Sequence, residues 1–111
     1  MSYSANHAWN NFKRGYIYRH HPLRCAACDT HISVELHHIV PISEPNSPRN
    51  VDSNIIALCR HHHFVIGHNS NWSISNPNVV RDVALIRSMT KKDKICLIVE
   101  PRFFNFVYYF A

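Results

Sequence analysis

Apolar residues recur at helical spacing near the start of the chain. These positions are Ala5, Trp9, Phe12 and Tyr16. Residues three or four apart lie on one face of a helix, so the pattern predicts an amphipathic helix. Ser4 is a favourable N-cap residue, and Pro22 stops the pattern. We therefore expect a helix from Ser4 to about His20.

The middle of the chain alternates between apolar runs and turn-forming residues. Residues 32–40 are rich in apolar and β-branched side chains, which predicts a strand. Residues 41–53 contain three prolines, three serines and two asparagines, a composition typical of a loop. Residues 55–58 form a second short apolar run, and residues 61–67 are a candidate helix. The expected order is strand, loop, strand and helix, within an α+β fold.

The last third of the chain predicts a further helix and two strands. Asn76 or Asn78 is a candidate cap for a helix over residues 79–89. Residues 94–100 and 103–110 have the composition of strands. The second run is too apolar for a free sheet edge. It is expected to pack under the preceding helix or to pair with a second copy of the chain in a homodimer.

Positive charge is concentrated at the start of the chain. The formal net charge is +5, and residues 1–24 contain no acidic residue. Their basic residues are Lys13, Arg14, Arg19 and Arg24. Basic patches attract phosphate backbones, although a merely soluble basic protein would show the same excess. No run approaches the roughly 20 apolar residues of a membrane span, and the start lacks a signal-peptide core. We expect a cytoplasmic protein without a membrane partner, made by a bacterium or in a phage-infected host cell.

Two Cys/His half-sites are the first candidate chemistry. Cys25 and Cys28 form a CxxC knuckle, and Cys59 is followed three residues later by His62. Two such half-sites can close a tetrahedral zinc site, and four protein ligands leave no open position, so this zinc would be structural. Cys96 is the rival of His62 for the fourth position. A thiol redox protein also uses CxxC, but no βαβ pattern surrounds it here.

Histidines are the second unusual feature. Nine of the ten lie between residues 20 and 68. The motif between the half-sites reads Glu35-Leu36-His37-His38-Ile39-Val40-Pro41-Ile42. A second run reads Asn54-Ile55-Ile56-Ala57-Leu58-Cys59-Arg60-His61-His62-His63. Together with the CxxC knuckle, these runs resemble the HNH endonuclease family over residues 25–63.

The resemblance implies a role for each matching residue. His38 would be the general base that activates water, and imidazole titrates in a suitable range for this task. His37 and His63 would hold a catalytic divalent ion. Asn54 would tie down the loop that orients the base histidine. Arg60 or His61 could contact the scissile phosphate; His68 is less expected as a ligand, although it could face the same cleft.

Two departures from the usual family pattern concern the metals. His62 stands where a fourth cysteine is common, so the zinc set would be Cys₃His, which zinc accepts. His37 stands where an aspartate is common. Mg²⁺ stays plausible without this carboxylate, but Mn²⁺, Ni²⁺, Co²⁺ and Zn²⁺ also become candidates.

The resulting interpretation is a single domain over residues 1–111, with a ββα-metal (His-Me finger) core stabilised by zinc. Residues 1–24 would form a basic helix, residues 25–68 the core and residues 69–111 an extension. The expected partner is double-stranded DNA, with phage packaging or restriction components as candidate protein partners. The alternatives are a zinc-ribbon-like nucleic-acid-binding module without catalysis, the thiol redox protein and, ranked lower because it lacks zinc knuckles, a colicin-like nuclease toxin.

Overall fold

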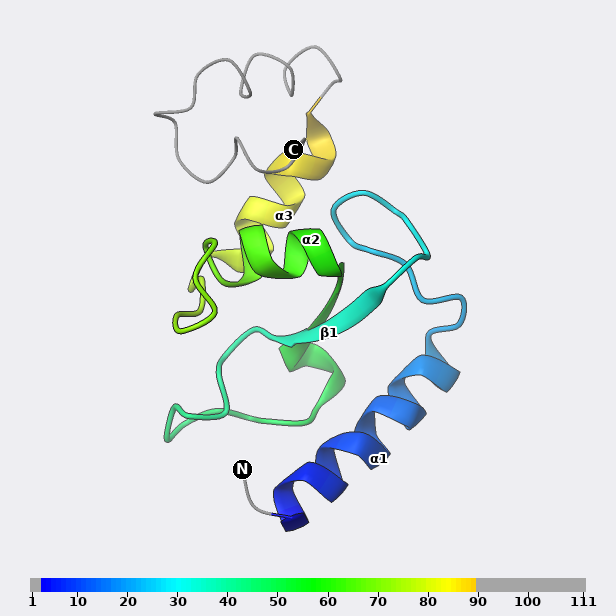
Figure 1. Ribbon diagram of the computed structural model, residues 1–111, viewed down its shortest axis with the longest axis vertical. Coiled ribbons are helices and arrows are strands. Elements are labelled where there is room, and N and C mark those ends of the chain that lie inside the picture. The colour runs from blue at the N-terminus through cyan, green and yellow to red at the C-terminus, as the bar shows by residue number, and fades with distance from the viewer. Residues whose placement is uncertain (1–2, 90–111) are drawn as a thin grey trace.

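The computed structural model describes residues 3–89 and shows an α+β arrangement (Figure 1). Its elements are α1 (Tyr3–Arg19), β1 (Val34–His38), the 3₁₀ turn η1 (Asp52–Asn54), β2 (Ile55–Cys59), α2 (Arg60–His62), the π-helix η2 (His63–Gly67) and α3 (Val79–Ser88). The strands expected at 94–100 and 103–110, the proposed pairing of two copies and Cys96 all lie outside the described residues. None of the helices within residues 3–89 has the length and apolar character needed to cross a membrane.

The two strands form an antiparallel hairpin whose faces are covered by different helices. The register pairs Val34 with Cys59 at one end and His38 with Ile55 at the other. Successive side chains on a strand point to opposite faces. Leu36 therefore faces α1, while its neighbour His37 faces the opposite side. Figure 1 shows α1 on one side of the hairpin and α2 with α3 on the other.

The face toward α1 has a small apolar core. Its buried members are Tyr16, Leu36 and Ile55, with Trp9, Phe12, Leu23 and Ala57 packed around them. The helical spacing of the aromatic residues in α1 thus produces one apolar face that covers the hairpin. The predicted helix from Ser4 to about His20 agrees with the observed one to within a residue at each end.

The opposite face carries the larger core, and two of the cysteines belong to it. The buried members of this core are Cys25, Ala27, Leu58, Cys59, Val65, Ile66, Val79, Val83 and Ile86. Leu58 from β2 and Ile66 from the π-helix are fully buried. The helices after the hairpin therefore pack directly around the Cys/His region and hold it against the sheet.

The first strand is shorter than the predicted run of residues 32–40. Ser33 has a left-handed backbone with φ of 53°, which interrupts the extended chain just before β1. At the other end, the Asn54 side chain takes up the backbone N–H and C=O of Val40. These groups cannot then continue a strand ladder, so the predicted ends were each wrong by two residues.

The helix expected over residues 79–89 is α3, and its capping differs from the simple prediction. The Asn78 side chain makes no cap hydrogen bond. Instead, Asn76 Oδ1 accepts from the Asn78 backbone N–H at 2.9 Å, and Asn76 Nδ2 donates to Asp82 Oδ2 at 2.8 Å. Asn76 Nδ2 also donates to the Ile66 carbonyl. Asn76 therefore joins the start of α3 to the π-helix.

Candidate metal centres and the adjoining hollow

The CxxC knuckle is held by its own turn and by β2. The Cys25 backbone N–H donates to the Thr30 carbonyl at 2.9 Å, and the Asp29 N–H donates back to the Cys25 carbonyl at 2.8 Å. The Ala26 N–H donates to Ala57 of β2 at 2.8 Å. This last bond places both cysteines of the knuckle beside the strand that carries Cys59.

The second half-site is a helix start. Cys59 is the last residue of β2, and its Sγ accepts the backbone N–H of His62 at 3.5 Å as the N-cap of α2. This capping bond turns the chain back, so that the His62 ring lies over the cysteines. Cys25, Cys59 and His62 are buried, while Cys28 is exposed.

The four donor atoms have the spacing of a tetrahedral metal site. Cys28 Sγ and Cys59 Sγ are 3.9 Å apart, and His62 Nδ1 lies 3.2 Å from Cys59 Sγ and 3.6 Å from Cys25 Sγ. Ligands about 2.3 Å from a zinc ion at tetrahedral angles are about 3.8 Å from each other. A disulfide would need a sulfur–sulfur distance of about 2.05 Å. This cluster could hold a structural zinc.

The pKa values of the three thiols indicate that all three can be thiolates together only with a cation at their centre. Burial acts to raise the pKa of Cys25, but hydrogen bonds led by His62 outweigh it and lower this pKa to about 6. Burial and the neighbouring Cys25 thiolate raise the pKa of Cys59 to about 12, and burial also raises that of Cys28. Three thiolates together need a positive charge to compensate them, which a metal supplies.

A second donor cluster contains only histidines. His37, His63 and His68 each place one ligand nitrogen within 4.8 Å of the others. His37 comes from β1, His63 begins the π-helix and His68 follows it. Their ring centroids are 5.0–5.1 Å apart in every pair. The consecutive residues His62 and His63 therefore belong to two different clusters.

The π-helix explains why His68 joins this cluster. In an α-helix, residues five apart would point about 140° away from each other. The chain from His63 to Gly67 instead forms a π turn, in which the hydrogen bonds join residues five apart. The wider turn brings His68 to the side occupied by His63. The sequence predicted a helix here, but not this change of register.

Hydrogen bonds fix which nitrogen of each ring is available. His68 Nδ1 lies 2.6 Å from the Ile74 carbonyl, which can only accept, so Nδ1 carries the proton and Nε2 has the lone pair. His63 Nδ1 lies 2.9 Å from Glu35 Oε1, so Nδ1 of His63 also carries the proton and its Nε2 has the lone pair. Such outer contacts orient metal-bound histidines in known sites. Buried His37 Nε2 has no hydrogen-bond partner among the described residues, as an atom facing a metal would.

Burial keeps two rings of this cluster, those of His37 and His63, neutral. Desolvation, followed by the neighbouring histidines His63 and His68, lowers the pKa of His37 to about 3. Desolvation also lowers the pKa of His63, although Glu35 acts in the opposite direction. Neutral imidazoles keep their lone pairs at neutral pH, as metal ligands must. A Cβ at Gly67 would lie 3.1 Å from His37 Nδ1, so the backbone approaches these rings closely.

His38 lies on the α1 side and is held there by two contacts. Its ring lies over Trp9 with centroids 4.4 Å apart. Its Nε2 lies 3.0 Å from Asn50 Oδ1. An amide oxygen only accepts, so Nε2 carries the proton and Nδ1 keeps a lone pair that can take a proton.

The three-histidine cluster and His38 open into one hollow of about 250 Å³. It is lined by Trp9, Leu36, His37, His38, Pro41, Ile42, His63, His68 and Ser75. Neighbouring residues on a strand diverge, but β1 ends at His38 and the chain then bends into the loop. His37 and His38 can therefore reach the same space from opposite faces of the hairpin.

Asn54 closes the loop between the two strands. It is buried, and its Oδ1 accepts from the Val40 N–H at 2.8 Å. Its Nδ2 donates to the carbonyls of Val40 and Arg49 at 3.1 and 3.0 Å. Its own carbonyl accepts from the Ile39 N–H. Asn54 therefore ties residues 39, 40 and 49 of the loop together.

The predicted phosphate-binding residues are not equivalent. Lys13 and Arg14 line a larger cavity beside the histidines, of about 680 Å³. Arg19 instead pairs with Asp52 at 2.7 Å, which fastens the end of α1 to η1. Hydrogen bonds from Arg19, and then from His20, lower the pKa of Asp52. Arg19 therefore has a structural partner and does not line the cavity.

The remaining candidates lie near the Cys/His cluster. Arg24 donates to the Asp29 carbonyl at 3.1 Å and so stabilises the CxxC knuckle. Arg60 is exposed at the start of α2, and the half-buried ring of His61 lies 5.1 Å from that of His62. None of these three lines the cavity that contains Lys13.

Three contributors were not identified as site residues from the sequence. Glu35 was quoted in the motif without a role, although its position two residues before His37 puts both on one face of β1. Asn50 carried no signal, because the loop gives no spacing rule. Gly67 carried none either, since its role depends on how closely the rings approach. A scan of protein-family models, a search of curated proteins and a search of solved structures each found no match for this chain.

Proposed function

We propose that the chain is a metal-dependent endonuclease of the HNH type, with a ββα-metal core, that hydrolyses phosphodiester bonds in DNA. One observation carries this proposal: a three-histidine donor cluster and an oriented, proton-accepting His38 line the same hollow. A purely structural metal site would need neither the opening nor a nearby base. The hairpin followed by a helix and the Cys₃His cluster are consistent with this fold.

The two clusters would hold two ions with different tasks. The Cys₃His set has four protein donors and would bind zinc as a structural element. The set of His37, His63 and His68 has three donors and opens to the hollow, so it would bind a divalent ion with room for a ligand. An all-nitrogen set favours Mn²⁺, Co²⁺, Ni²⁺ or Zn²⁺ over Mg²⁺, which prefers oxygen ligands.

His38 would act as the general base. Its Nδ1 would take a proton from the attacking water, while Asn50 holds Nε2–H and Trp9 fixes the ring plane. A bound divalent ion would supply the positive charge that stabilises the phosphate oxygens as negative charge develops. Glu35 would keep His63 oriented throughout. The expected products carry 5′-phosphate and 3′-hydroxyl ends.

Nicking of supercoiled plasmid DNA tests this function. The wild-type protein, with its zinc retained, is assayed with Mg²⁺, Mn²⁺, Co²⁺, Ni²⁺ and added Zn²⁺ in turn. We expect cleavage in at least one metal and its loss in His38→Ala. The matched control is His31→Ala, because His31 is exposed and belongs to neither cluster. Equal cleavage by wild type and His38→Ala would refute the proposed function. DNA binding without cleavage in any metal would instead favour the zinc-ribbon-like binding module.

A further inference from the structure

The histidine hollow is part of a longer depression. The cavity of about 680 Å³ on the α1 side shares Trp9, Leu36 and His63 with the hollow. A cavity of about 560 Å³ on the other side shares Pro41, His68 and Ser75 with it. We call the first cavity the α1 arm and the second the loop arm. The candidate metal cluster lies between the two arms.

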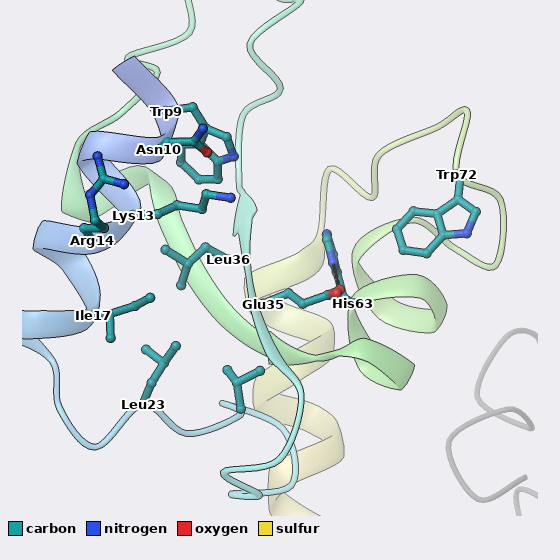
Figure 2. A pocket seen from close by; sticks show the side chains of 11 residues that line it. Trp9, Asn10, Lys13, Arg14, Ile17, Leu23, Glu35, Leu36, His63 and Trp72 are labelled. Atoms are coloured by element: carbon teal, nitrogen blue, oxygen red, sulfur yellow. Dashed lines mark hydrogen bonds and ion pairs between the residues drawn. The ribbon is translucent and has the colours of Figure 1, made fainter. Parts of the chain in front are cut away.

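The α1 arm crosses the outer edge of β1, which has no partner strand among the described residues. Figure 2 shows Lys13 and Arg14 from α1 on one side of β1, and His63 and Trp72 on the other. The one acidic residue that lines this arm, Glu35, is paired with His63. The free positive charge of the arm therefore comes from α1 and suits a phosphate.

Besides this positive charge, the α1 arm has an exposed aromatic residue, Trp72. This residue is 55% exposed, although its side chain is among the largest apolar groups in the described chain. It contacts His63, Phe64 and His68, with ring centroids 4.9–5.3 Å apart. The rest of the indole surface faces the two arms, both of which Trp72 lines. An exposed indole that rests against candidate metal ligands is suited to stack on a planar group of the substrate.

We propose, on the basis of the proposed nuclease function, that the α1 arm binds an unpaired stretch of DNA next to the scissile phosphate. A base would stack on Trp72, and Lys13 with Arg14 would contact the phosphates. Bases in a duplex stack on each other and hide their faces, so an indole in this position has a stacking partner only in an unpaired strand. The volume of the arm also lies in the roughly 300–1,000 Å³ range of small-ligand sites. The preferred substrate is therefore single-stranded, flapped or gapped DNA rather than intact duplex.

Tryptophan fluorescence tests the stacking directly. The chain has two tryptophans, so Trp9→Phe leaves Trp72 as the single reporter. Protein that retains its zinc but has no added divalent metal is titrated with a twelve-nucleotide thymidine oligomer and with a blunt duplex of equal length. We expect strong quenching by the single strand and little by the duplex. Unquenched Trp72 fluorescence at saturating oligomer, with binding verified by anisotropy, would overturn the proposal.

Anisotropy with labelled DNA measures the affinity. In a His38→Ala background, Trp72→Ala should weaken single-strand binding by about 5- to 150-fold, the range for loss of one stacked base. Binding of blunt duplex should change little. Tyr18→Ala is the matched control, because Tyr18 is an exposed aromatic residue of α1 that lines neither the α1 arm nor the loop arm. Equal weakening of both DNA forms by Trp72→Ala would contradict a stacking role.

The salt dependence of DNA affinity separates the contribution of charge from that of stacking. Lys13→Gln should reduce the slope of log affinity against log salt by about 0.7 for single-stranded DNA. Arg81→Gln, on the exposed surface of α3, is its control and should leave the slope unchanged. These binding readouts are independent of cleavage. If the nuclease proposal fails, nicking will be absent while the binding pattern stays intact. If this inference fails, the protein will nick DNA but show no preference for unpaired DNA.

Discussion

The two donor clusters contain the adjacent residues His62 and His63 and differ in almost every other property. The cluster that contains His62 has three sulfur donors and is built into the larger core. The cluster that contains His63 has three nitrogen donors and opens onto the hollow. One turn of helix therefore serves two sites, because consecutive side chains on a helix point in different directions.

This difference indicates how each site would respond to substitution of its ligands. A site whose donors are part of the core should lose fold and metal together. A site whose rings are held by outer hydrogen bonds on an existing frame should lose metal chemistry and keep its fold. Variants at the sulfur cluster should therefore lose both zinc and fold, whereas variants at the histidine cluster should lose the divalent ion and keep the fold.

The largest effect is expected at the sulfur cluster. Cys59→Ser should remove the zinc and abolish cooperative folding. Structural zinc in small peptides contributes about 10–16 kcal/mol of apparent binding free energy, whereas small domains have only about 5–15 kcal/mol of stability. Metal analysis and thermal unfolding by circular dichroism measure both quantities. A Cys59→Ser protein that is free of zinc and unfolds like the wild type would remove the distinction between the clusters.

The next largest effect is expected at the histidine cluster. His63→Ala should lower the nicking rate by roughly 10²- to 10³-fold, because metal charge stabilisation contributes several kcal/mol to catalysis. The same variant should keep its structural zinc and unfold cooperatively. His68→Ala should have the same pattern with a smaller loss if His68 is the third ligand. If His68→Ala matched the wild type in divalent-metal affinity, the site would reduce to His37 and His63.

The contrast also shows what the sequence could predict. The hydrophobic spacing located α1, the hairpin and α3 to within one or two residues, because these elements bury apolar faces. The two half-sites in sequence were sufficient to predict one Cys₃His cluster, because metal ligation restricts both residue type and spacing. The separation of His62 from His63 was also predicted, and the structure places their rings in different clusters.

The features that the sequence did not predict depend on contacts between distant segments. His68 reaches the cluster through a π turn, and helical periodicity gave no sign of that register. Asn50 contacts His38 across a loop whose shape is set by the tertiary position of Asn54. The C-terminal end of β1 depends on the same asparagine. No local pattern in the sequence encodes these distances.

Glu35 gives a sharper test of the histidine cluster. Glu35→Ala removes the acceptor that orients His63, and loss of such outer partners typically lowers metal affinity or activity by about 10- to 100-fold. Glu35→Gln keeps an acceptor oxygen and should recover part of the loss. Divalent-metal titration followed by nicking measures both steps. His31→Ala, at an exposed position outside both clusters, is the control. A Glu35→Ala protein with unchanged metal affinity would show that the 2.9 Å contact to His63 does not tune the site.

The smallest effect is expected from a single methyl group at Gly67. A Cβ there would lie 3.1 and 3.2 Å from the His37 ring and 3.2 Å from His63 Cδ2, so both rings must shift by a few tenths of an ångström. Gly67→Ala should therefore weaken divalent-metal binding by about three- to tenfold, below the usual range for outer contacts. Its fold should stay intact or gain up to about 1 kcal/mol, since alanine is favoured over glycine within helices.

Gly15→Ala is the matched control for Gly67→Ala, because Gly15 is the other glycine and lies within α1. The nearest atom to its Cβ would be Arg19 Nη1 at 2.9 Å, the end of a flexible side chain that can move away. Gly15→Ala should therefore keep both metal binding and nicking. Zinc content should be unchanged in both variants, because neither glycine touches the sulfur cluster. Loss of zinc from Gly67→Ala would mean that the two clusters are mechanically coupled through the π-helix, and the independence inferred from His62 and His63 would then be wrong.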